Sequence, residues 1–318
     1  MTTLPPLHKT LRAIKARIWL RLRCRVGQAF LPAAAFPGGH NRKARSASQT
    51  SHLAFQSCFA LLLLSSLSHA AEPVTIRFRA VAGPQQLSCG KRYEGIGTTK
   101  STISPRDFRF YVHNLRLLAP TGQEIPLELA QDDKWQFDDV ALLDFEDGTG
   151  SCRNGTPETN RQITGTVPAP AKFRGLRFTL GVPHAKNHTD LLAMPAPLNL
   201  TAMAWTWNAG RTFARLDFTS TGTPRGFAIH LGSTGCTPST TANTIPTTCA
   251  QPNRFEITLP DFDPSTDTVL ADLTALLAET DVDHATGSSM PGCISDPETP
   301  ACGPILRRFA TSFFRTGK

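Results

Sequence analysis

The chain has 318 residues, of which 40% are hydrophobic, and a formal net charge of +8. The positive charge belongs to the start of the sequence, because ten of the 33 lysines and arginines and none of the 25 acidic residues lie in residues 1–70. The remainder has 23 basic against 25 acidic residues, a net charge of −2. This balance excludes functions that need a strongly basic surface, and we expect no binding to nucleic acid.

Residues 1–70 are predicted to be a leader. An apolar run, Phe59–Leu64, precedes small residues that end at Ala70, the pattern of a secretory signal peptide cleaved after Ala70 or Ala71. The run is far shorter than the roughly 20 residues of a membrane span, so we expect no stable membrane insertion. Because this signal begins near residue 50, residues 1–50 resemble an over-extended start. We predict a periplasmic or secreted protein with one domain over 71–318.

Alternation of apolar and polar residues predicts strands along most of this domain. In chain order, the clearest segments are VTIRFRAV (74–81), DFRFYVHNLRLL (107–118), QITGTVP (162–168), GLRFTLGV (175–182) and GFAIHLG (226–232). Helical spacing is present in PLELAQDD (126–133) and DTVLADLTALLAET (267–280). Many short strands separated by Pro, Gly, Asn and Thr predict an all-β fold: a single antiparallel, Ig-like β-sandwich with one or two short helices.

Six cysteines follow residue 70, an even number that predicts three disulfides in an exported chain. The short spacings of Cys236–Cys249 and Cys293–Cys302 indicate two local bonds, which would leave Cys89 and Cys152 for the third. The absence of a Cys-x-x-Cys pair disfavours zinc, and the absence of Cys-x-x-Cys-His means that this sequence attaches no c-type haem itself.

Histidines are the candidate metal ligands. His113 and His230 each interrupt a predicted strand on the side opposite its bulky apolar residues. Such a histidine is usually a surface residue, but two of them on separate strands weaken that interpretation. The segment GVPHAKNHTD (181–190) adds His184 and His188 in a loop that follows a strand. This loop could supply a metal ligand, or its polar residues could simply cap a turn.

No residue pattern predicts catalysis. The HLGSTGC segment (230–236) places a serine near a histidine but is not the Gly-x-Ser-x-Gly elbow of hydrolases. The acidic run LLDFEDGTG (142–150) could bind calcium through oxygen ligands, although it lacks EF-hand spacing and a solvated turn is the simpler interpretation. We therefore expect a binding protein, not an enzyme.

Two of the four tryptophans, Trp205 and Trp207, lie in TAMAWTWNAG (201–210). In a strand these indoles would point to the same side. They could form a core, a stacking platform for sugar, or a redox site. An indole offers only an N–H donor, so a tryptophan becomes a metal ligand only after oxidative ring opening to kynurenine exposes an aniline nitrogen and a ketone.

An ordered set of motifs resembles the MbnP-type periplasmic copper proteins, the four-Cys family of the metallo-mystery pair system. The resemblance runs from about Val74 to Phe309. It rests on DFRFYVHNLRL, VALLDFEDGTGSC, ETNRQITGTVP, GLRFTLGVPHAKNHTD, PLNLTAMAWTWNAGRTFARLDF, FAIHLGSTGC and PGCISDPETPAC. Each motif alone is weak, but their order along the chain is highly specific.

The resemblance implies an exported β-rich copper protein with a di-haem partner of the cytochrome c peroxidase type (MbnH type). That partner oxidises a tryptophan to kynurenine, which then helps histidines to hold copper, in our expectation Cu(I). Carried onto this chain, the oxidised residue would be Trp207 or Trp205, with Trp135 as a third candidate. The copper ligands would be His113, His230 and, next, His188.

The sequence departs from the family pattern at Cys293-Ile294-Ser295, where the family has Cys-Met-Ser. If that methionine supported the metal, Met290 would have to replace it. The alternative function is an extracellular β-sandwich that binds carbohydrate or protein through Trp205 and Trp207.

Overall fold

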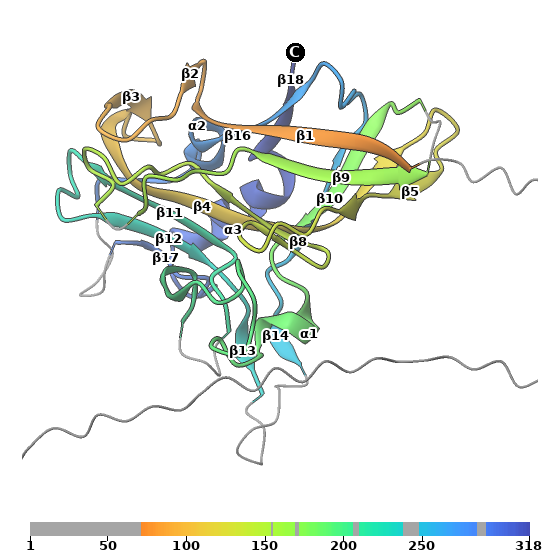
Figure 1. Ribbon diagram of the computed structural model, residues 1–318. Helices are drawn as coiled ribbons and strands as arrows, with labels where there is room; N and C mark the ends of the chain where they lie inside the picture. The colour runs from red at the N-terminus through yellow and green to blue at the C-terminus, as the bar shows by residue number, and fades with distance from the viewer. Residues whose placement is uncertain (1–70, 154, 169–171, 206–209, 238–247, 285–290) are drawn as a thin grey trace, which may run out of the picture. The chain divides into compact units, whose positions relative to one another are not determined.

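The computed structural model describes residues 71–318 except 154, 169–171, 206–209, 238–247 and 285–290. The predicted leader, Trp207 and Met290 lie outside the described residues. In the described part, two β-sheets pack face to face and short helices lie beside them (Figure 1). The predicted β-sandwich is confirmed, with few helices and three disulfides.

The first sheet is built on β1 (Ala71–Ala82). β1 pairs antiparallel with β9 (Gln162–Pro168) and parallel with β16 (Thr268–Asp272), so one of its pairings departs from the purely antiparallel prediction. The sheet is completed by β2 (Gln85–Gln86), β6 (Glu128–Leu129) and β18 (Phe314–Gly317).

The second sheet is built on the long strand β4 (Ser101–Leu118), which contains His113. Its main path is β15-β10-β4-β11-β12-β17, and four short strands also join it. The bounds are β3 (Tyr93–Ile96), β5 (Glu124–Pro126), β7 (Gln136–Phe137), β8 (Val140–Asp144), β10 (Gly175–Leu180), β11 (Ala214–Ser220), β12 (Phe227–Leu231), β15 (Phe255–Leu259) and β17 (Gly292–Cys293). β12 and β17 form the second parallel pair.

Phenylalanine rings fill the space between the sheets. Phe108 and Phe110 of β4 point inward and meet Phe313 and Phe314, with ring centroids 5.4–6.1 Å apart across the interface. These side chains are at most 6% exposed. Because each buried aromatic side chain removes a large apolar area from water, this cluster stabilises the packing of the two sheets.

The opposite side of β4 is also buried, although the alternating pattern predicted a solvated face. Arg109, Tyr111 and His113 point away from the phenylalanine core, and their exposed fractions are only 3%, 0% and 8%. The Tyr111 hydroxyl donates to the Pro197 carbonyl at 2.7 Å, which identifies part of the cover. The polar face of β4 is therefore also packed against other residues, and it forms the base of a second buried layer.

Two strands, β11 and β10, pair with successive parts of the same edge of β4, and the boundary between them is at Tyr111. β8 pairs with Arg109–His113 along one edge. Along the other edge, β11 pairs with β4 up to Phe110, and β10 pairs with it from Val112 onward. The sheet is split at this point, and the same split continues outward because β15 pairs with β10 whereas β12 pairs with β11.

Two segments leave the sheet at this split and return to it. In the first excursion (residues 181–213), Gly181 N donates to the Tyr111 carbonyl and Tyr111 N donates to the Phe213 carbonyl, both at 2.8 Å. It carries α1 (His184–Asn187) and the 3-10 turn η1 (Thr201–Met203). The second excursion (residues 232–254) carries the hairpin β13 (Thr234–Cys236) and β14 (Cys249–Gln251). Figure 1 shows α1 beside β13 and β14 on one side of the second sheet.

Both predicted helical segments differ from the structure. Residues 126–133 contain β6 and the end of β5, because their backbone pairs with β9 and β4. Residues 267–280 begin as β16, and only α2 (Leu273–Leu277) is helical. The change occurs at Asp272, whose side chain accepts from the backbone N–H groups of Thr274 and Ala275 and so caps the helix. A further helix, α3 (Cys302–Thr311), was not predicted.

The disulfide pairing predicted from the spacings is confirmed: Cys89–Cys152, Cys236–Cys249 and Cys293–Cys302. Cys293 and Cys302 are buried, as is Cys152. Cys236–Cys249 is the described disulfide in which both cysteines are partly exposed. It joins directly paired residues of β13 and β14.

Candidate metal centre

His113 lies at the base of the second buried layer, where β4 meets β8 and β10. Its Nδ1 atom is 2.9 Å from the Gly181 carbonyl, a geometry in which Nδ1 carries the proton and donates. Burial lowers the pKa of His113. The histidine is therefore held neutral, and its position is tied to the first residue of the first excursion.

His230 lies elsewhere on this sheet and belongs to an ion-pair network. Its Nε2 atom is 2.9 Å from the Asp217 carboxylate, which also contacts Arg215 at 2.9 Å. His230 is opposite Arg215, and Arg215 is opposite Arg109, four residues from His113. Strand geometry then separates the backbones of His113 and His230 by about 13 Å along the strands and about 10 Å across them. The structure does not bring these two histidines together.

His184 and His188 are brought together by α1. The helix has one turn, and residues four apart lie on the same face, so the two imidazole centroids are 5.3 Å apart. Ligand atoms of His184, His188 and Cys249 all lie within 4.8 Å of one another. This group is one of two His/Cys/Asp/Glu clusters of this kind in the described part of the chain, and it is the one that contains histidine.

His188 is 2% exposed and is enclosed by neighbours from both excursions. Its Nε2 atom is 3.1 Å from the Asn187 amide nitrogen and 3.5 Å from the Cys249 sulfur. The Asn187 amide oxygen accepts from Arg211 N at 2.8 Å, so the amide nitrogen faces His188 and donates to it. Nε2 is therefore the unprotonated ring nitrogen, the form that binds metals, and a metal bound there would replace the hydrogen bond from Asn187.

Arg211 fixes the end of α1 from beneath. Its guanidinium donates to the carbonyls of Leu198 at 2.8 Å and Asn187 at 2.7 Å, and also to the Lys186 carbonyl. A cation at this position stabilises carbonyl groups that a helix end leaves without partners. Arg211 is only 1% exposed and supports the candidate centre from within the protein. It was not identified from the sequence. Its only sequence signal was a charged residue beside the tryptophan motif.

The tryptophan motif adjoins this centre. Trp205 N donates to the Gly210 carbonyl at 3.0 Å. Gly210 has φ +85°, and a Cβ there would lie 2.7 Å from the Asn187 amide, so glycine permits the close approach to α1. The Trp205 ring packs against Gly232 at the start of the second excursion. Residues 201–203 form the 3-10 turn η1 and no strand, and Trp207 lies outside the described residues.

Trp135 lies at a different place, beside β7. Its ring is partly buried against the core, and the Lys134 ammonium lies 5.1 Å from the ring centroid. It lines a pocket together with polar residues on and just before β9, and no histidine is among the residues that line this pocket. We therefore place Trp135 outside the candidate centre.

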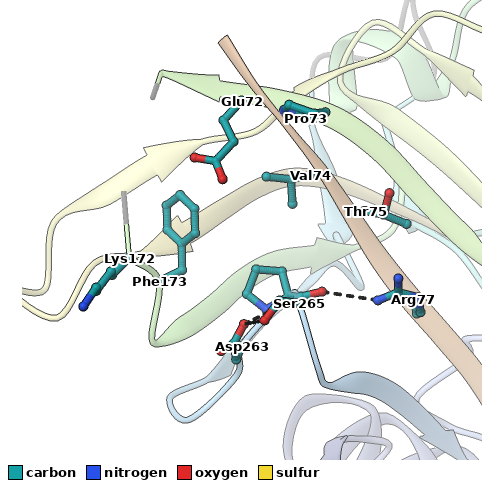
Figure 2. Close-up of a pocket in the computed structure, with 10 residues that line it drawn as sticks. Glu72, Pro73, Val74, Thr75, Arg77, Lys172, Phe173, Asp263 and Ser265 are labelled. Atoms are coloured by element: carbon teal, nitrogen blue, oxygen red, sulfur yellow. Dashed lines mark hydrogen bonds between the residues drawn. The ribbon is translucent and has the colours of Figure 1, made fainter. Parts of the chain in front are cut away.

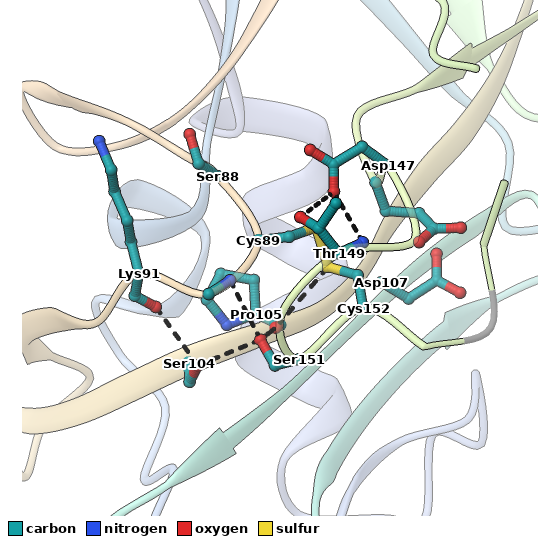
Figure 3. The surroundings of a disulfide bond; sticks show 12 residues. Ser88, Cys89, Lys91, Ser104, Pro105, Asp107, Asp147, Thr149, Ser151 and Cys152 are labelled. Atoms are coloured by element: carbon teal, nitrogen blue, oxygen red, sulfur yellow. Dashed lines mark hydrogen bonds between the residues drawn. A yellow bond between two sulfur atoms is a disulfide. The ribbon is translucent and has the colours of Figure 1, made fainter. Parts of the chain in front are cut away.

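The acidic run surrounds a buried arginine. Arg109 forms a bidentate ion pair with Asp107, and its Nη1 atom is 3.8 Å from the Glu146 carboxylate. Glu146 also lies beside the Cys89–Cys152 disulfide, whose surroundings, with Asp107 and Asp147, are drawn in Figure 3. The Arg109 guanidinium already neutralises the carboxylates that a calcium ion would have to bind. The arrangement therefore favours an ion-pair network over a calcium site.

Asp144, at the end of β8, is expected to make the stability of the fold depend on pH. Burial raises its pKa to about 7, against about 3.9 in an unfolded chain. Between these values the folded state holds a proton that the unfolded state has lost, so stability falls as the pH rises from about 4 to about 7. Asp144→Asn should remove this dependence and raise the free energy of unfolding at pH 8 by on the order of 2 kcal/mol.

Denaturant unfolding at pH 5 and pH 8 checks this expectation. The Asp144→Asn variant keeps an oxygen for the Glu146 N–H group, which donates to Asp144 Oδ1 at 3.1 Å. A variant that is destabilised equally at both pH values would contradict it.

A pocket of about 570 Å³ lies at the start of β1 (Figure 2). It is lined by polar and charged groups that include Glu72, Arg77, Lys172 and Asp263, and Arg77 donates to the Pro264 carbonyl at 3.4 Å. Its lining contains no histidine, cysteine or tryptophan. The candidate metal centre and this pocket are separate features.

Within the described residues, no helix combines the length and apolar character needed to cross a membrane. A comparison with curated proteins gave no match. The family model of MbnP matches residues 71–295. Among solved structures, MbnP from Methylosinus trichosporium is similar, with 33% sequence identity and a TM-score of 0.67 over 74% of this chain and 88% of that one. The chain belongs to the MbnP family.

Proposed function

We propose that this chain is an exported copper-binding protein, not an enzyme, and that its copper centre lies at α1. The observation that carries the proposal is the grouping of His184 and His188 with the Cys249 sulfur, within 4.8 Å, beside Trp205 and Gly210. Imidazole nitrogens suit copper, and few neutral donors favour Cu(I). His188 thus becomes the leading ligand among the predicted histidines, and His184 joins it.

We also propose that oxidation of Trp207 or Trp205 completes the centre. Kynurenine would add an aniline nitrogen beside the two imidazoles. Trp207 is the preferred residue because the Trp205 ring is already packed against Gly232. The oxidant would be supplied through a di-haem partner of the cytochrome c peroxidase type, in keeping with the family resemblance.

His113 and His230 take different roles in this proposal. Burial and the contact with the Gly181 carbonyl support a positioning role for His113 at the base of the first excursion, the segment that carries α1. The Asp217 contact assigns His230 to the ion-pair network. Neither is needed as a direct ligand of a centre at His184 and His188.

Intact-mass measurement tests the maturation. Two peroxide equivalents add two oxygen atoms across the indole double bond, and hydrolysis then releases formate, so the residue gains one oxygen and loses one carbon, about 4 Da in total. We expect this gain in the wild-type chain and in Trp205→Phe after treatment with the di-haem partner and peroxide. We expect no gain in Trp207→Phe.

The same samples test copper binding in a Cu(I) competition assay. Modified protein should bind Cu(I) more tightly than unmodified protein, and Trp207→Phe should remain at the unmodified level. An unchanged mass in the wild-type chain would refute the maturation. A mass gain without any change in copper affinity would refute the role of kynurenine as a ligand.

A further inference from the structure

The Cys236–Cys249 disulfide contacts His188 directly. The His188 Nε2 atom is 3.5 Å from the Cys249 sulfur and 3.8 Å from the Cys236 sulfur. His184 contributes a ligand atom within 4.8 Å of those of His188 and Cys249. Two sulfurs and two imidazoles therefore converge from the two excursions, although no cysteine spacing in the sequence signals a metal site.

These distances match a tetrahedral site. For metal–nitrogen distances of about 2.0 Å and metal–sulfur distances of about 2.3 Å, the edge between a nitrogen and a sulfur ligand is about 3.5 Å. The distance from His188 Nε2 to the Cys249 sulfur, 3.5 Å, has this length, and the distance to the Cys236 sulfur, 3.8 Å, is slightly longer. In such a site the two sulfur ligands would lie about 3.8 Å apart. The Cys236 and Cys249 sulfurs can reach this separation only when the bond between them is broken.

We propose that the Cys236–Cys249 disulfide is a redox switch on the metal centre: its reduction creates a site with two thiolate and two imidazole ligands. The copper identity of the metal rests on the proposed function, whereas the four donors belong to this chain alone. In the oxidised protein the disulfide sulfurs are weak donors beside the two imidazoles. In the reduced protein two thiolates select a soft ion such as Cu(I).

The reductant is a dithiol of the Cys-x-x-Cys oxidoreductase class. One of its thiolates attacks a sulfur of the disulfide, the Cys236–Cys249 bond breaks, and a mixed disulfide forms. The second thiol of the reductant then displaces the protein cysteine, so the reductant leaves as a disulfide and the protein gains two electrons and two protons. Metal binding as a dithiolate releases both protons to solvent.

Access distinguishes this disulfide from the others. Cys236 and Cys249 are both partly exposed, whereas Cys293 and Cys302 are 1% and 0% exposed; in the third disulfide only Cys89 is partly exposed and Cys152 is 1% exposed. An external dithiol must reach a sulfur in line with the bond that it breaks. Mild reduction should therefore open the β13–β14 disulfide first, and the disulfides of the sandwich should remain intact.

The experiment uses the full chain, with unmodified tryptophans, before and after mild dithiol reduction and removal of the reductant. Differential alkylation and peptide mass identify the reduced cysteines, which we expect to be Cys236 and Cys249. Reduced protein should give the thiolate-to-cobalt charge-transfer band and intense visible bands of tetrahedral Co(II). Its affinity for Cu(I), measured against a chromophoric chelator, should rise at least about tenfold.

The double variant C236S/C249S is the matched control, since it removes the thiols and keeps both imidazoles. It should show no change on treatment with the dithiol. His188→Ala in the reduced state should lose the tetrahedral cobalt spectrum and keep the alkylation pattern. Reduction confined to these cysteines without a thiolate-to-cobalt band, or without a gain in Cu(I) affinity, overturns the proposal.

The two proposals fail separately. If kynurenine-containing oxidised protein binds no Cu(I), the proposed function fails, but the cobalt spectrum of the reduced protein still decides the switch. If oxidised protein binds Cu(I) and reduction leaves that affinity unchanged, the switch fails and the copper function stands.

Discussion

Replacing His188 with alanine is expected to weaken Cu(I) binding by at least about a hundredfold, because the centre loses its most enclosed imidazole. The His188 Nε2 atom lies 3.1 Å from the Asn187 amide nitrogen and 3.5 Å and 3.8 Å from the sulfurs of Cys249 and Cys236. Competition against a Cu(I) chelator measures the loss. The His184→Ala variant should lose less, since His184 is partly exposed and water can take its place.

Two histidine variants serve as controls for this result. His230→Ala breaks the contact with Asp217 but leaves α1 intact, and His284→Ala removes an exposed histidine paired with Asp281. Both should bind Cu(I) within about threefold of the wild-type chain, because neither imidazole is at the centre. A large loss in His230→Ala together with an unchanged His188→Ala would show that the copper site is elsewhere on the second sheet.

Replacing Arg211 with methionine is expected to lower the free energy of unfolding by about 3–5 kcal/mol, since several buried carbonyls lose a charged donor at once. These carbonyls belong to Asn187, Lys186 and Leu198, which surround the end of α1. Denaturant unfolding measures the stability. Copper affinity should fall as well, because the residues that hold His184 and His188 in register lose their anchor.

Arg106→Met is the matched control, because Arg106 is exposed and donates to a single carbonyl, that of Arg225, at 2.9 Å. Its effect should stay within about 0.5 kcal/mol. Arg211→Lys keeps the charge but lacks the planar fork, and it should be intermediate in stability. If Arg211→Met unfolds at the same denaturant concentration as Arg106→Met, the guanidinium is not the anchor of α1.

Much of the sandwich could be predicted because local pattern and final environment agree. The alternation in residues 107–118 reported the inward face of β4 correctly, and the short cysteine spacings matched the local disulfides. The helix expected over 267–280 was wrong for a non-local reason. Val269 and Leu270 have helical spacing to the later leucines, but their backbone pairs with β1 in the first sheet. The helix begins only after Asp272, which is its N-cap.

The candidate site was only partly predictable. His113 and His230 share the same pattern of apolar neighbours, yet strand register places them apart. His188 was identified, but its closeness to Cys236 and Cys249 depends on where two chain segments leave the sheet. The position of that split is set by hydrogen bonds at Tyr111, which no periodicity reports.

The split at Tyr111 also bears on how this protein can change in evolution. The first excursion leaves the sheet at Gly181 and returns at Phe213, and both residues bond to the backbone of the same Tyr111. Residues can be inserted or deleted between them without shifting the register of β10 or β11, since each strand aligns on β4 independently. New metal preferences can thus arise in these segments while the phenylalanine core is inherited unaltered.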